Sequence, residues 1–215
     1  MNIFIIGIGH TTGLLRSLDD FLQGLLEPLS CSAFVMAQPL EAALQQLVCE
    51  QIARQTLLDV REAEDGETLQ PGCLYLIPAG FEAVIAPGAQ VRLSAVVAGR
   101  RPASLGLFET AAAVFHKAAT GIFLSGINEE LFRGATAIRS AGGLVLIHTP
   151  QATWDERSAS QSLFGQYLPA RQMGAYLARN QSLTLREYIM FGRMELDEAL
   201  CITSFNRSFG NWMEQ

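Results

Sequence analysis

Long hydrophobic runs are absent from this chain of 215 residues. Apolar segments such as Asn2–Ile8 and Leu144–Ile147 have the length of a β-strand, whereas a membrane-spanning helix needs roughly 20 apolar residues. No charged segment precedes Asn2–Ile8, and Gly7 and Gly9 punctuate it, so it predicts a buried first strand and not a signal peptide. We therefore expect a cytoplasmic protein without a membrane-inserted segment.

Basic residues are few. Lys and Arg number 15 against 21 Asp and Glu, which gives a net charge of −6 and a pI of about 5.1. A nucleic-acid-binding surface needs clustered basic residues, and the nearest approach to a cluster is the pair Arg100-Arg101. Nucleic acid is therefore not an expected partner. Hydrophobic residues make up 49% of the chain, which is enough apolar surface to exclude a disordered protein.

Closely spaced metal ligands are also lacking. No C-x-x-C spacing occurs among the four cysteines, which are Cys31, Cys49, Cys73 and Cys201. Neither a disulfide framework nor a thiolate metal site is therefore expected, and the cysteines are interpreted as small buried hydrophobes. The three histidines form no i, i+4 pair of ligands on a helix. We expect no metal and no cofactor.

Strand-length apolar segments alternate with segments of helical periodicity. Strands are predicted at Ile3–Ile8, Ala33–Ala37, Leu58–Arg61, Leu74–Ile77, Gly121–Leu124 and Gly143–Ile147. Helices are predicted at Leu14–Leu26, Leu40–Ile52, Leu107–Phe115 and Leu131–Ser140. This order predicts a three-layer, doubly wound α/β fold with a mostly parallel sheet. The first strand should lie at or near the centre of the sheet, because it is apolar on both faces.

Two further features complete the predicted organisation. The segments Ala83–Ile85 and Val91–Leu93, with Pro87-Gly88 between them, predict an antiparallel hairpin inserted into the α/β pattern. The composition shifts near residue 180 toward Asn, Gln, Arg and Ser. Residues 1–179 are therefore predicted to form one domain and residues 180–215 a C-terminal appendage, with a helix around Leu185–Leu200.

Ligands of doubly wound folds bind beyond the carboxyl ends of the strands. The loops expected there are Gly9–Gly13, Gln38–Pro39, Gly126–Glu130 and His148–Thr153. The first of them has Thr12 where a dinucleotide fingerprint needs its third glycine, and no Gly-Lys-Ser/Thr follows as in a Walker loop. A small-molecule-binding or nucleotide-binding α/β domain nevertheless stays an alternative.

The most specific motif is the segment Val60–Pro78. Its spacing is V-x-E-A-x-D-G-x-x-L-x-P-G-x-x-Y-x-x-P, and it resembles a signature of the chemotaxis receptor methylesterases, the protein-glutamate methylesterases. The likeness covers about Ile3 to Gly174 and continues in Ile8–Gly13, Gly99–Pro102, Phe123–Gly126, Ala141–Gly143 and Phe164–Gly165. The receiver domain that this family carries is not expected here, because the first strand begins at Ile3.

The resemblance implies a Ser-His-Asp triad, and all three positions are substituted. Thr11 stands at the nucleophile and Glu130 at the aspartate, and the histidine position falls on Pro39, or on Ala37 if the match contains a gap of two residues. The resemblance also implies that the backbone N–H of Ile127 is the oxyanion-hole donor, and that Asn128 stands where the family has a glycine. The other residues expected in the cleft are His10, Thr12 and His148. The loops Gly9–Gly13 and Gly126–Glu130 should converge at one end of the sheet and bring Thr11 and Glu130 within about 10 Å.

Loss of the only base argues against the family reaction, since removing one triad member already removes most of the rate. The sequence therefore predicts a methylesterase-like, catalytically impaired protein that acts as a binding or regulatory module. The expected partner is the cytoplasmic region of a chemoreceptor or another chemotaxis signalling protein. The alternative is an active hydrolase in which Thr11 attacks and is assisted either by Glu130 or by a relocated histidine base, His10 or His148.

Overall fold

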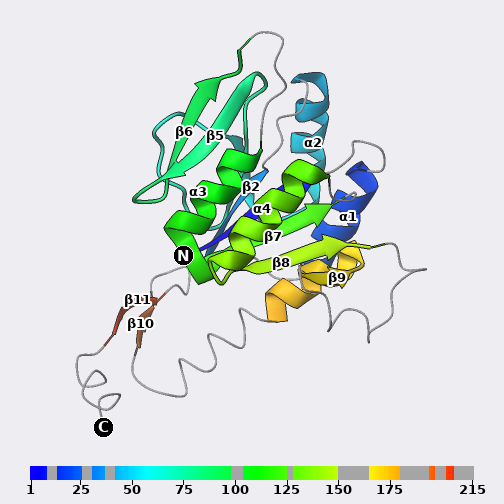
Figure 1. Ribbon diagram of the computed structural model, residues 1–215. Coiled ribbons are helices and arrows are strands. Elements are labelled where there is room, and N and C mark those ends of the chain that lie inside the picture. The colour runs from blue at the N-terminus through cyan, green and yellow to red at the C-terminus, as the bar shows by residue number, and fades with distance from the viewer. Residues whose placement is uncertain are drawn as a thin grey trace.

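Seven strands form one parallel sheet in the order β3-β4-β2-β1-β7-β8-β9 (Figure 1). The computed structural model describes residues 1–8, 14–25, 31–36, 42–97, 104–124, 128–149, 165–179, 194–196 and 202–205. The strands are β1 Asn2–Ile8, β2 Ser32–Met36, β3 Asp59–Glu62, β4 Cys73–Leu76, β7 Ala119–Leu124, β8 Leu144–His148 and β9 Gln166–Leu168. The central position of β1 confirms the prediction from its two apolar faces.

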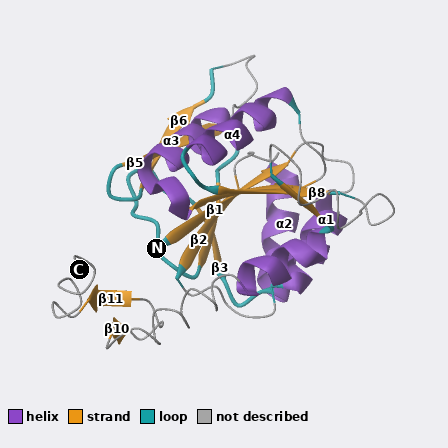
Figure 2. Cartoon of the chain, turned by 60° about the horizontal axis from the view of Figure 1, so that its bottom comes forward, coloured by secondary structure: helices purple, strands orange, loops and turns teal. Residues whose placement is uncertain are grey.

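Helices cover both faces of the sheet, which confirms the three-layer α/β fold (Figure 2). Helices α1 (Leu14–Gly24) and α2 (Ala42–Gln55) lie on one face, and α3 (Leu105–Phe115) and α4 (Glu129–Ser140) lie on the other. A short 3-10 helix, His116–Ala118, follows α3, and residues 170–179 are helical. In β1, Ile3 and Ile5 belong to the core under α3 and α4, and the even-numbered apolar residues belong to the core under α1 and α2.

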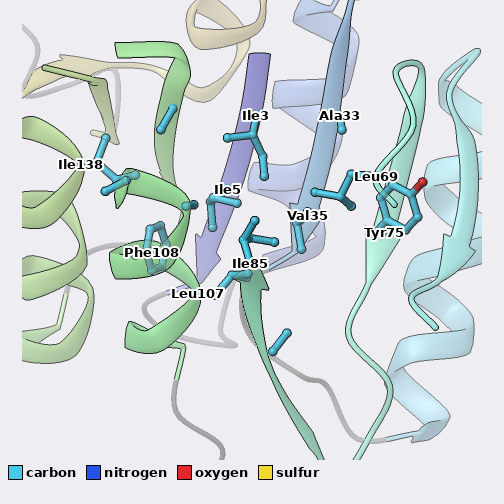
Figure 3. Packing of buried hydrophobic residues seen from close by; sticks show 14 of the residues in the cluster. Ile3, Ile5, Ala33, Val35, Leu69, Tyr75, Ile85, Leu107, Phe108 and Ile138 are labelled. Carbon is cyan, nitrogen blue, oxygen red and sulfur yellow. The ribbon is translucent and has the colours of Figure 1, made fainter. Parts of the chain in front are cut away.

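The core under α3 and α4 is organised around Phe108 (Figure 3). Its ring stacks on Phe123 with centroids 5.1 Å apart. The same ring leaves no room for a side chain at Gly7 of β1 or Gly134 of α4, where a Cβ would lie 2.9 Å and 2.8 Å from it. Two glycines therefore allow this ring, which belongs to α3, to lie close to the central strand β1 and to α4.

The predicted hairpin is present as β5 (Phe81–Ala86) and β6 (Gln90–Ala95), which pair antiparallel. Its buried face, with Ala83, Ile85 and Val91, joins the core under α3. The backbone N–H of Ile85 donates to Thr110 Oγ1 of α3 at 2.9 Å, so the hairpin is fixed to that helix by a hydrogen bond as well as by apolar packing.

The family-like segment Val60–Pro78 holds this hairpin against the sheet. The Asp65 carboxylate accepts from the backbone N–H of Leu93 at 2.8 Å, and the N–H of Gly66 donates to the carbonyl of Val91 at 2.8 Å. Gly66 adopts φ +83°, a conformation that glycine reaches without steric cost. The strongest motif of the sequence therefore has a structural role: it connects β3 to β4 and carries the hairpin.

Two sequence expectations are wrong. Within the predicted helix Leu185–Leu200, residues Met194–Leu196 form strand β10, which pairs antiparallel with β11 (Ile202–Phe205) in a separate sheet. The apolar Met194 and Leu196 flank Glu195, a period-2 pattern that suits a strand as well as a helix. Cys31 is disulfide-bonded, against the expectation of no disulfide, whereas Cys49 and Cys73 are free thiols. Distance along the sequence does not limit which cysteines meet in space.

Within the described ranges, no helix is long and apolar enough to cross a membrane. The same residues contain no group of three or more His, Cys, Asp or Glu side chains placed to hold a metal ion. The division into residues 1–179 and 180–215 stays a prediction.

Candidate functional site

The carboxyl ends of the parallel strands meet at one edge of the sheet, which we call the carboxyl edge. Ile8 at the end of β1 is the register partner of Leu124 at the end of β7, so these two strands end side by side. Strand β2, whose Met36 pairs with Leu76 of β4, ends at the same edge. His10, Thr11, Thr12, Pro39 and Ile127 lie outside the described residues. The expected separation of Thr11 and Glu130 therefore stays a prediction.

Glu130 lies in the first turn of α4 and binds the start of α3. Its Oε1 accepts hydrogen bonds from the Ser104 hydroxyl and the Leu105 N–H, both at 2.9 Å, and from the Ser104 N–H. Ser104 is only 5% exposed, so these donors have little access to water. The first N–H groups of a helix have no partner within the helix and carry its positive dipole end. The Glu130 carboxylate accepts from the N–H groups of Ser104 and Leu105 and so acts as a cap supplied from another element.

Asn128 caps α4 itself. Its backbone is extended at φ −102° and ψ 179°, and its side chain accepts from the Leu131 N–H at 2.9 Å. Asparagine is among the preferred residues at this position, and Glu129 and Glu130 in the first turn complement the helix dipole. Asn128 and Glu130 thus both serve as helix caps, Asn128 for α4 and Glu130 for α3.

Sequence reasoning placed the start of this helix at Leu131, two residues late. The signal for the true start was present, since Asn128 followed by two acidic residues is a typical helix beginning. Sequence reasoning missed Ser104 as a partner of Glu130. No local signal could have found this contact, because the two residues are separated by 26 positions and meet only when α3 packs on α4.

His148 is the last residue of β8 and lies at the carboxyl edge, half-buried. Side chains alternate along a strand, and Leu146 belongs to the core under α1 and α2, so His148 faces the same side. Burial lowers the pKa of His148 below its ordinary value, and the carboxylate of Asp20 in α1 raises it in part. The imidazole is therefore mostly neutral near pH 7, the form that can accept a proton.

The lowered pKa of His148 predicts a pH dependence of stability. A histidine whose pKa is lower when folded contributes stability above its unfolded pKa of about 6.5, and that contribution is lost as the pH falls below this value. We expect the melting temperature of the wild-type protein to fall more steeply below about pH 6.5 than that of His148→Gln. Thermal unfolding monitored by circular dichroism over this range measures the difference, and identical slopes would contradict the prediction.

The hydrogen bonds of Glu130 predict a structural effect of its removal. Glu130→Ala should lower the free energy of unfolding by about 2–3 kcal/mol, because hydrogen bonds to a charged acceptor are lost and part-buried donors are left unpaired. Glu129→Ala is the matched control, since it removes the same charge from an exposed neighbour in the same turn, and should have a much smaller effect. Urea unfolding compares the two variants. Equal effects would show that Glu130 acts only through its charge.

A model of the CheB methylesterase family matches residues 6–175 of the chain. Among curated relatives, a protein-glutamate methylesterase/protein-glutamine glutaminase of Maricaulis maris is 35% identical over 153 residues, which are 66% of this chain and 36% of the relative. A relative of the same name from Caulobacter vibrioides is 31% identical over 176 residues, 80% of this chain and 48% of the relative. The chain thus spans about half or less of the length of these relatives.

A solved structure has the same fold. The catalytic domain of Thermotoga maritima CheB methylesterase superimposes with a TM-score of 0.66 and covers 83% of this chain and 98% of that domain. The sequence identity is 23%, so this likeness concerns the architecture of the domain.

Proposed function

Because the chain belongs to the CheB methylesterase family, we propose that it is a catalytically impaired member that acts by binding. The observation that carries this proposal is that the Glu130 carboxylate is hydrogen-bonded to Ser104 and Leu105. The carboxylate at the family acid position holds the start of α3 through three hydrogen bonds to one oxygen. In a triad this carboxylate would hold the tautomer of a histidine base.

The residue types at the other two positions support the same proposal. The hydroxyl of Thr11 has an unperturbed pKa far above neutrality, so its attack on an ester needs a base in contact with it. The family resemblance puts Pro39 at the position of that base, and the segment Met36–Leu40 contains no titratable side chain. Loss of general-base assistance alone should cost roughly 10²–10⁴ in rate.

The proposed partner is the cytoplasmic region of a chemoreceptor or another chemotaxis signalling protein. This follows from family membership, since the curated relatives are protein-glutamate methylesterases. A module that keeps the family fold and loses the base could still occupy the same target. It would then regulate by competing with an active methylesterase for methylated sites.

The test is a single experiment on a purified, methylated chemoreceptor fragment. We expect the chain to co-sediment with the fragment and to release methanol no faster than buffer or the Thr11→Ala variant. The Maricaulis maris relative serves as the active control. The double variant Thr11→Ser, Pro39→His should also stay at background, because Glu130 remains bound to α3 and Asn128 remains a helix cap. Turnover that vanishes in Thr11→Ala would refute the proposed impairment, and failure to co-sediment would refute the binding role.

One observation favours a second candidate, an active hydrolase with a relocated base. His148 lies at the carboxyl edge, and burial lowers its pKa, so a neutral imidazole is available there. In this case methanol release by the wild-type chain would disappear in both Thr11→Ala and His148→Gln. The same assay therefore separates the two candidates.

A further inference from the structure

We draw no further inference here: the strongest candidate, the exposed apolar strip of Phe81, Ala95 and Val97 at the open end of the β5–β6 hairpin, has nothing in the structure to show what covers it.

Discussion

Truncation of Phe108 to alanine should lower the free energy of unfolding by about 3–5 kcal/mol, the range for large aromatic residues removed from a packed core. The side chain is fully buried, stacks on Phe123, and fills the space above Gly7 and Gly134. Neither glycine can extend a side chain into the cavity that the truncation leaves. The loss should therefore lie in the upper part of this range.

Phe81→Ala is the matched control for Phe108→Ala, because it makes the same truncation at a side chain that is 38% exposed. Chemical denaturation of both variants gives the comparison. For a domain of this size we expect the melting temperature of Phe108→Ala to fall by roughly 10 °C. A loss no larger than that of Phe81→Ala would mean that Phe108 does not organise the packing of α3, α4 and β1.

Replacement of Gly174 by alanine is expected to cost about 3 kcal/mol, at the upper end for overpacking, because the obstacle is backbone and not a flexible side chain. A Cβ at Gly174 would lie 2.5 Å from the carbonyl oxygen of Phe21 and 2.6 Å from the carbonyl carbon of Gly24. A Cβ at Gly24 would lie 2.0 Å from the carbonyl oxygen of Arg171. The helix at 170–179 and α1 thus cross in backbone contact, with a glycine on each side.

Gly106→Ala provides the control for the crossing glycines. Among the described residues its Cβ would meet only Val84 Cγ1, at 3.4 Å, and alanine is the better helix former by about 1 kcal/mol. We therefore expect Gly106→Ala to be neutral or stabilising and Gly174→Ala to lower the unfolding midpoint in urea. If both variants unfold at the wild-type midpoint, the two helices are not in backbone contact in solution.

Asn128 and Glu130 have a common physical role at the start of α4. Asn128 is the N-cap of α4, and the side chain of Glu130 reaches the start of α3. One carboxylate oxygen with three donors is well suited to fixing a helix terminus. These hydrogen bonds give Glu130 a structural role in joining α3 to α4.

The sequence by itself determined the layered fold and the central strand. A strand such as Ile3–Ile8, apolar at every position except its glycine, can be buried only between two layers of helices, and parallel strands need the helical connections that the pattern shows. Pro87-Gly88 likewise specified the hairpin, because the turn between two short strands is determined by the residues of the turn itself. These features depend on periodicity and turn chemistry, which a sequence displays directly.

Only the tertiary structure decided the role of Glu130, the crossing at Gly24 and Gly174, and the function of Val60–Pro78 as a support for the hairpin. Each depends on a contact between residues far apart in the chain, such as the 26 positions between Ser104 and Glu130. Hydrophobic periodicity says which face of a helix is buried, but the partner of a side chain at its end depends on how two packed helices are aligned. The alignment of α3 with α4 follows from the core that they share, where the ring of Phe108 packs against Gly134. The position of a single glycine in the sequence does not reveal this alignment.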